Sequence, residues 1–207
     1  MKEHFILFDF DGVIADSFNL AFEIQKMICP HLDEDAYRKR FDRNINDCKE
    51  PIHHTEQCRH DINFFAEYVP RMKNEVRIIP GIKEIIIELE KNYKLIIISS
   101  TITSPVRDFL LDHGLDRHFT EIMGNDVHES KVEKIKMVFE KFSAKPNDYI
   151  FITDTLGDMR EASHFSIDSI GVSWGFQERE ALLKGKPFRL VDKPSELLTA
   201  VSDYFKI

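Results

Sequence analysis

Residues 5–12 read FILFDFDG, an unbroken apolar run that ends in an acid, a second acid two residues later and a glycine. A run without polar alternation is typical of a strand that is buried on both faces, as in a parallel sheet. Two further runs have the same character, LIIISS at residues 95–100 and YIFIT at residues 149–153. Shorter strand candidates lie at residues 121–124 and 169–173.

Helix-like patterns lie between these runs. Apolar residues recur at helical spacing in residues 80–90, 105–113, 130–142 and 194–205. Strands that alternate with helices indicate βαβ units. The sequence therefore predicts an α/β fold with a mostly parallel sheet.

One segment interrupts this alternation. Between residues 18 and 79 there is no strong strand run, and helix-like patterns and charged residues take its place. Its length of roughly sixty residues far exceeds an ordinary connection between a strand and a helix, which has about 2–6 residues. We interpret it as a helical insert that forms a second, small domain.

Composition limits the partners and the location that we expect. The chain has 207 residues and a formal net charge of -8, which disfavours nucleic acid and anionic membranes as general partners. Three cysteines without a paired motif are typical of a reducing compartment, so we expect a cytoplasmic protein. The N-terminal apolar run is too short for a signal peptide or a membrane span. The oligomeric state is left open.

Polar residues stand at the carboxyl ends of the predicted strands, which in an open α/β sheet form the edge that binds ligands. They are Asp9, Asp11 and Gly12 at the first run, Ser99 and Ser100 at the second, Lys131 at the start of the pattern 130–142, and Asp154 and Asp158 after the third run. We therefore expect acids, a hydroxyl and a lysine to meet at one edge of the sheet.

The four acids of this group are expected to hold a metal ion. Asp9, Asp11, Asp154 and Asp158 cannot all stay ionised side by side without a counter-charge, and Lys131 alone does not balance them. Clustered carboxylates favour a hard divalent ion such as Mg²⁺, which also binds phosphate oxygens. The cluster therefore predicts a magnesium site and a phosphorylated substrate.

The spacing of the first two acids points to covalent chemistry. Asp9 and Asp11 are two residues apart at a strand end, so both could face one pocket. One carboxylate could attack phosphorus and form an aspartyl-phosphate, and the other could protonate the leaving oxygen and then deprotonate water. Gly12 permits a tight backbone path just past the strand. A hydroxyl and the Lys131 ammonium could hold the other phosphoryl oxygens.

Four stretches together resemble the motifs of the haloacid dehalogenase superfamily. Residues 9–17, DFDGVIADS, resemble the first motif, and the apolar run that reaches Ser99 is similar to the second. Lys131 resembles the third-motif lysine, although valine follows it where proline is usual. Residues 154–158, DTLGD, are similar to the fourth motif, and a threonine precedes them where glycine is common. Residues 171–176, GVSWGF, look like a segment of phosphoglycolate-phosphatase-like members.

This resemblance implies an overall architecture. It predicts a Rossmann-like parallel sheet, commonly of strand order 5-4-1-2-3, with a small α-helical cap inserted after the first motif. The core would comprise residues 1–15 and 80–207, and the cap would comprise residues 16–79.

The resemblance also implies a role for each residue. Asp9 would be the nucleophile and Asp11 the general acid and base, while Ser99 and Lys131 would hold the transferring phosphoryl group. Mg²⁺ would be bound by the Asp9 side chain, the Asp11 main-chain carbonyl and Asp154, with Asp158 ordering the site. Dehalogenases of the superfamily lack an acid at the position of Asp11, so its presence favours phosphoryl chemistry.

We therefore expect a magnesium-dependent phosphatase that acts on a small phosphorylated metabolite. One alternative is a phosphomutase of the β-phosphoglucomutase type, which would have the same motifs and return the phosphoryl group to a sugar. A second alternative is a non-catalytic binding protein on the same fold. The cap determines the substrate and has the weakest resemblance to the family. Phosphoglycolate, a sugar phosphate and a nucleotide therefore all stay open as substrates.

Several residues keep a simpler interpretation. Ser99 could be a plain strand-end hydroxyl, Asp158 could serve only as a helix N-cap, and Lys134 and Lys136 rival Lys131. The insert also holds a group of potential metal ligands, namely Cys48, His53, His54, Cys58 and His60. Their spacing fits no usual zinc pattern, and a polar or solvated surface explains them better.

Overall fold

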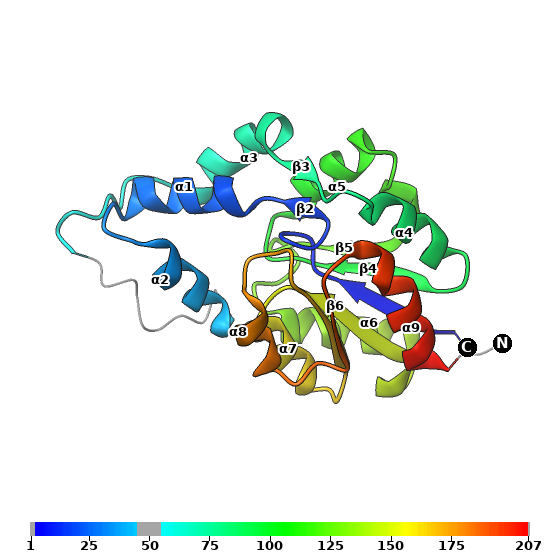
Figure 1. The fold of residues 1–207 in the computed structure, drawn as a ribbon. Helices are drawn as coiled ribbons and strands as arrows, with labels where there is room; N and C mark the ends of the chain where they lie inside the picture. The colour runs from blue at the N-terminus through cyan, green and yellow to red at the C-terminus, as the bar shows by residue number, and fades with distance from the viewer. Residues whose placement is uncertain (1–2, 45–54, 207) are drawn as a thin grey trace.

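The computed structural model describes residues 3–44 and 55–206, and its centre is a six-stranded parallel sheet in the order β5-β4-β1-β6-β7-β8 (Figure 1). The strands are β1 Phe5–Phe8, β4 Lys94–Ile98, β5 Phe119–Met123, β6 Tyr149–Thr153, β7 Asp168–Val172 and β8 Arg189–Val191. When β1, β4, β5, β6 and β7 are numbered 1 to 5 in the order in which they follow along the chain, their order in the sheet, read from β7, is 5-4-1-2-3. This is the predicted order. The predicted α/β class is confirmed, and β8 adds an edge strand that the sequence analysis missed.

Helices cover both faces of this sheet (Figure 1). They are α4 Ile82–Glu90, α5 Thr103–Asp112, α6 Lys131–Phe142, α7 Leu156–Ser163, α8 Arg179–Leu183 and α9 Leu197–Phe205, with short 3-10 turns at Asp116–His118, Pro146–Asp148 and Pro194–Glu196. Within β1, Ile6 and Phe8 pack in a cluster with residues of α4, α5 and α9, whereas Phe5 and Leu7 pack with residues of α6 and α7. The continuous apolar runs therefore reflect burial on both faces of the sheet.

The chain between the first strand and α4 forms the segment that we call the cap segment, residues 16–79. Its elements are β2 Ala15–Asp16 at the start, then α1 Phe18–Ile28, α2 Glu34–Lys39, the 3-10 turn η1 Arg40–Asp42, α3 Phe64–Glu75 and β3 Arg77–Ile78. The strands β2 and β3 pair antiparallel, so the outgoing and returning chains run side by side. The helices α1, α2 and α3 lie beyond one edge of the sheet (Figure 1). That this segment is a separate domain stays a prediction.

The strands end two residues earlier than their apolar runs. The structure ends β1 at Phe8 and β4 at Ile98, whereas the runs continue to Phe10 and Ser100. The Asp9 amide still bonds to the carbonyl of Ile152 at 2.9 Å, and the chain then turns at Gly12, whose φ is 72°. This left-handed turn places the residues after β1 at the carboxyl edge. Within the described residues, no helix is long and apolar enough to cross a membrane.

Candidate active site

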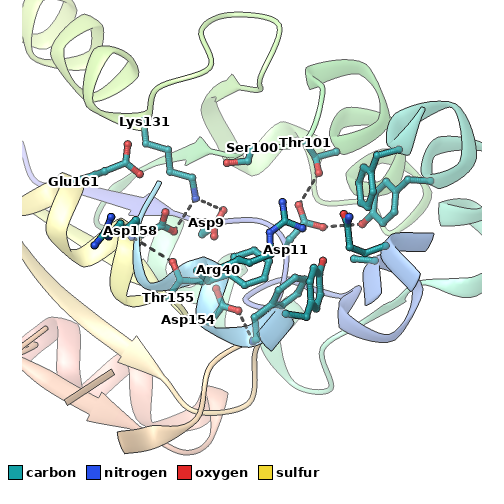
Figure 2. Close-up of a pocket in the computed structure, with 18 of the residues that line it drawn as sticks. Asp9, Asp11, Arg40, Ser100, Thr101, Lys131, Asp154, Thr155, Asp158 and Glu161 are labelled. Atoms are coloured by element: carbon teal, nitrogen blue, oxygen red, sulfur yellow. Dashed lines mark hydrogen bonds and ion pairs between the residues drawn. The ribbon is translucent and has the colours of Figure 1, made fainter. Parts of the chain in front are cut away.

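A cavity of about 270 Å³ opens at the carboxyl edge of the sheet, beneath the cap segment (Figure 2). The sheet edge and α6 and α7 contribute polar residues to it, and the cap segment contributes aromatic residues and two arginines. The main lining residues are Asp9, Asp11, Tyr37, Arg40, Phe41, Arg43, Phe64, Phe65, Tyr68, Ser100, Thr101, Lys131, Asp154, Thr155, Asp158, Glu161 and Phe176. Every predicted site residue except Gly12 and Ser99 therefore lines this cavity.

Lys131 joins two of the predicted carboxylates (Figure 2). Its Nζ lies 2.9 Å from Asp9 Oδ1 and 2.7 Å from Asp158 Oδ2, and all three side chains are buried. Burial raises the pKa of Asp9 well above its ordinary value, and nearby Asp158 adds to this while Lys131 opposes it. Burial alone would raise the pKa of Asp158, but the attraction of Lys131 and the hydrogen bonds with Asp9, Lys131 and Thr153 together hold it below its ordinary value. The site thus keeps a cation beside the predicted nucleophile.

Asp154 is held in place by its close neighbours. The amide of Phe176 donates to Asp154 Oδ2 at 2.6 Å, whereas the buried Oδ1 has no hydrogen-bond partner among the residues that the structure describes. A Cβ added to Gly12 would lie 1.9 Å from Oδ2, and one added to Gly175 would lie 2.3 Å from the same atom. Burial raises the pKa of Asp154 to about 7, although the Phe176 amide opposes this shift. Two glycines therefore provide the space that this carboxylate occupies.

The Asp11 carboxylate points toward the cap segment rather than toward the other three acids (Figure 2). It accepts hydrogen bonds from the hydroxyls of Ser17 at 2.8 Å, Tyr68 at 2.7 Å and Thr101 at 2.7 Å. Three donors compensate the charge of this carboxylate without a metal ion. All four acids line one cavity, but the Asp11 side chain is turned to its hydroxyl donors. The resemblance implies a main-chain carbonyl as the Asp11 ligand, and this ligand set stays a prediction.

The serines after β4 occupy different positions. Ser100 lines the cavity, whereas Ser99 is fully buried and its hydroxyl accepts a hydrogen bond from the Thr101 amide at 2.9 Å. The Ser99 carbonyl accepts from Lys134 Nζ at 2.6 Å, and Gly124 O accepts from the same ammonium at 3.3 Å. Lys134 therefore secures the ends of β4 and β5, while Lys131, one turn earlier, reaches the carboxylates. The phosphoryl-binding role of Ser99 stays a prediction.

A model of the haloacid dehalogenase-like hydrolase family matches residues 6–172. The chain belongs to this family. Among curated relatives, it is 23% identical over 211 residues to a phosphoglycolate phosphatase of Synechococcus elongatus, covering 97% of this chain and 98% of the relative. It is 26% identical over 216 residues to pyrophosphatase PpaX of Listeria monocytogenes, covering 96% of each protein.

Solved structures of the haloacid dehalogenase-like fold agree with this assignment. A haloacid dehalogenase-like hydrolase from Streptococcus pneumoniae superimposes with a TM-score of 0.80 at 24% identity, covering 96% of this chain and 98% of that chain. A predicted phosphoglycolate phosphatase from Haemophilus somnus gives a TM-score of 0.74 at 20% identity, covering 97% and 99%. The predicted family, fold and hydrolase character are therefore confirmed.

Phosphatases of this family generally use Mg²⁺, and the residues present here fit such an ion. Mg²⁺ prefers oxygen ligands and usually keeps several waters, so it needs only a few protein groups. The buried and unpartnered Oδ1 of Asp154 offers one such group, and the Asp9 carboxylate lies in the same cavity. Within residues 3–44 and 55–206, no three acidic, histidine or cysteine side chains form a ready-made cluster, so a carbonyl would have to complete the set.

The cap segment supplies site residues that the motifs did not reveal. Tyr68 binds Asp11, and Arg40 lies beside the cavity with its guanidinium 6.0 Å from the Tyr37 ring centre. Tyr68 lies 57 residues from Asp11 along the chain, and no local pattern connects the two. Its place on an apolar face of α3 was the only available signal. Asp158 is not an N-cap, because Thr155 caps α7 and accepts a hydrogen bond from the Asp158 amide at 3.3 Å.

The potential metal ligands of the insert divide into two groups. Cys48, His53 and His54 lie outside the described residues. Cys58 and His60 are described: Cys58 is buried against Cys29, with 2.7 Å between their sulfurs, and His60 is exposed. Among the described residues the group does not form a metal cluster.

Proposed function

We propose that this hydrolase is a magnesium-dependent phosphatase that acts on a small phosphate monoester through an aspartyl-phosphate on Asp9. The observation that carries the proposal is the pair of contacts from Lys131 to Asp9 and Asp158 beside the unpartnered oxygen of Asp154. A carboxylate nucleophile, a fixed cation and an oxygen ligand face one buried cavity. These are the groups that phosphoryl transfer requires.

The residues of the chain divide the reaction between them. Asp9 attacks phosphorus, and the oxygen that leaves the substrate takes a proton from Asp11, which is then the base for the attacking water. Lys131 keeps its proton, because Asp158 and Asp9 raise its pKa above the ordinary value despite the opposing effect of burial. Its ammonium can therefore balance the charge of the transferred phosphoryl group. Bound Mg²⁺ would supply the positive charge that keeps Asp9 and Asp154 ionised.

The hydroxyls around Asp11 orient the proposed acid and base. Thr101 comes from the core, whereas Ser17 at the start of α1 and Tyr68 on α3 come from the cap segment. The orientation of Asp11, the proposed acid and base, therefore depends on the contact that Tyr68 makes while the cap segment covers the site. Such a contact would make proton transfer depend on closure over the substrate.

The cavity supports a small substrate. Its volume of about 270 Å³ and its cover of aromatic residues leave no room for a folded protein. The relatives named phosphoglycolate phosphatase and pyrophosphatase support the same size class, and we propose a cytoplasmic phosphorylated metabolite. A phosphomutase would use the same Asp9 and Asp11, but no observed residue favours the return of the phosphoryl group to a sugar.

Hydrolysis of a generic aryl phosphate, with and without Mg²⁺, tests the proposal. The purified protein should release phosphate only with Mg²⁺, and Asp9→Asn should abolish this activity while the fold persists by circular dichroism. Asp203→Asn is the matched control, because Asp203 pairs with Arg189 on the surface, away from the cavity. Activity that survives in Asp9→Asn would refute the mechanism. Turnover that requires a sugar bisphosphate would favour the mutase, and binding without turnover would favour a binding protein.

A further inference from the structure

Two cysteines of the cap segment face each other in its interior. Cys29 directly follows α1 as its C-cap, and Cys58 precedes α3 by six residues. Their sulfurs lie 2.7 Å apart, and neither cysteine is in a disulfide within the described residues. The side chain of Cys29 is fully buried, whereas Cys58 is 7% exposed. Neither thiol contacts the cavity, so the phosphatase chemistry does not account for this pair.

The backbone holds the two cysteines together independently of their side chains. The amide of Arg59, next to Cys58, donates to the carbonyl of Ile28, next to Cys29, at 2.7 Å. The amide of Cys29 donates to Gln25 O at 2.8 Å, which fixes the end of α1. A disulfide has a sulfur–sulfur distance of about 2.05 Å, so the two sulfurs need to approach by only about 0.7 Å. The fold therefore already has the arrangement that a bond requires.

We propose that Cys29 and Cys58 form a reversible disulfide by exchange with a low-molecular-weight disulfide. The Cys58 thiolate attacks one sulfur of the small disulfide, which leaves a mixed disulfide on Cys58 and releases one small thiol. Cys29 then attacks the Cys58 sulfur, forms the Cys29–Cys58 bond and releases the second small thiol. The two cysteines lose two electrons and two protons, and the small disulfide gains them.

The surroundings of the pair set this order of attack. Cys58 is the thiol that reaches the surface, and its sulfur lies 3.9 Å from Nδ1 of His31, a group that can take up the thiol proton. Burial, followed by contact with Cys58, raises the pKa of Cys29 to about 11. Cys29 therefore stays protonated at neutral pH and is the second group to react, when the mixed disulfide has already placed an acceptor sulfur beside it.

The bond would close a ring around one wall of the cavity. The ring runs from residue 29 to residue 58 and contains α2 and η1, which carry Tyr37, Arg40 and Phe41. It also carries Asp42, whose main-chain oxygen accepts from Arg160 of the core at 2.6 Å. A ring of about 30 residues removes much of the freedom of this segment in the unfolded chain. The proposed modification thus stabilises the segment that covers the site.

Equilibration of the intact protein in mixtures of oxidised and reduced glutathione tests the proposal. Oxidation should lower the intact mass by two hydrogens, and peptide mapping should recover the Cys29–Cys58 link. The unfolding temperature should rise by about 5 °C or more, and a reductant should reverse both changes. Because the readouts are mass and unfolding, they do not depend on whether the protein is a phosphatase.

Single variants make the result specific. Cys48→Ser should keep the mass loss and the rise in unfolding temperature, whereas Cys58→Ser and Cys29→Ala should each abolish both. The wild-type measurement stands even where the substitution at buried Cys29 weakens the fold. Three outcomes would overturn the proposal: a glutathione adduct that never resolves, a link that involves Cys48, or two thiols that resist oxidation at every ratio tested.

Discussion

Gly12→Ala should lower both the stability of the protein and its magnesium-dependent turnover, and glycine controls can distinguish the two effects. Gly12 has a φ of 72°, and a Cβ at this position would lie 1.9 Å from Asp154 Oδ2 and 2.7 Å from the Phe176 ring. The substitution therefore imposes a left-handed conformation on alanine and also pushes the carboxylate away. The proposed Mg²⁺ ligand must shift, because neither the strand nor the ring can yield easily.

Both effects have an expected size. A left-handed alanine costs about 1–2 kcal/mol of folding free energy, and forced repacking costs about 1–3 kcal/mol more. An ordinary contact needs about 3.4 Å, so the carboxylate has to move by more than 1 Å. Misplacement of a site by about 1 Å can lower turnover by about 10²-fold. We therefore expect a decrease of this order in magnesium-dependent turnover, with a weaker apparent affinity for Mg²⁺.

Two other glycine variants serve as controls. Gly81→Ala imposes a similar backbone strain, since Gly81 has a φ of 86°, but its Cβ would meet only Pro194 at 4.0 Å. It should lower the unfolding temperature by about 2–8 °C and leave Mg²⁺ dependence unchanged. Gly175→Ala crowds Asp154 without a positive φ, so it should weaken Mg²⁺ dependence as Gly12→Ala does. Equal activity losses in Gly12→Ala and Gly81→Ala would refute the assignment of Asp154.

Three further changes test other parts of the site. Because burial raises the pKa of Asp154 from 3.8 to about 7, this carboxyl favours the folded metal-free protein below pH ~4 and loses that contribution as the pH rises toward 7. Protons compete with Mg²⁺ for the same oxygen, so the rise in unfolding temperature caused by Mg²⁺ should be larger at pH 8 than at pH 6, and a pH-independent rise would contradict this. Tyr68→Phe removes one hydroxyl from Asp11 and should lower kcat about tenfold with little effect on stability, and an unchanged kcat would show that this contact is only structural. Lys134→Met leaves the buried Ser99 carbonyl without its donor, while Gly124 O keeps the Val127 amide, and should reduce the free energy of unfolding by about 1–3 kcal/mol in urea titrations. Lys136→Met, on an exposed side chain, should have no measurable effect.

The sheet was predictable because its central strands are continuous apolar runs in the sequence. The predicted strand at residues 149–153 matches β6 residue for residue. The runs at β1 and β4 overshot by two residues, because Phe10 is still buried although the ladder has ended, and hydrophobicity does not mark that point. The edge strand β8 has three residues, too few for a periodic pattern to be recognised.

The site was predictable where its residues follow buried parallel strands, because the carboxyl ends of these strands meet at one edge of the sheet. Asp9 and Lys131 follow from the motifs at the sheet edge, and they meet there at 2.9 Å. The direction of the Asp11 side chain did not follow, because its partner Tyr68 comes from a helix that folds back over the edge. The burial of Ser99 could not be predicted either, because the sequence does not distinguish it from the adjacent Ser100. The turn after β4 places Ser100, and not Ser99, in the cavity.

The pairing of β2 with β3 has a consequence for protein engineering. The chain enters the cap segment at Ala15–Asp16 and leaves it at Arg77–Ile78, and two adjacent ladder pairs, Ala15 with Ile78 and Asp16 with Arg77, join the two crossings. Any foreign insert whose ends lie as far apart as two neighbouring strands, about 5 Å, can be grafted between these points without moving Asp9 or Lys131. Swapping the insert between relatives is therefore a direct route to chimaeras with new substrate preferences, in which the new insert must also supply the donor that Tyr68 gives to Asp11.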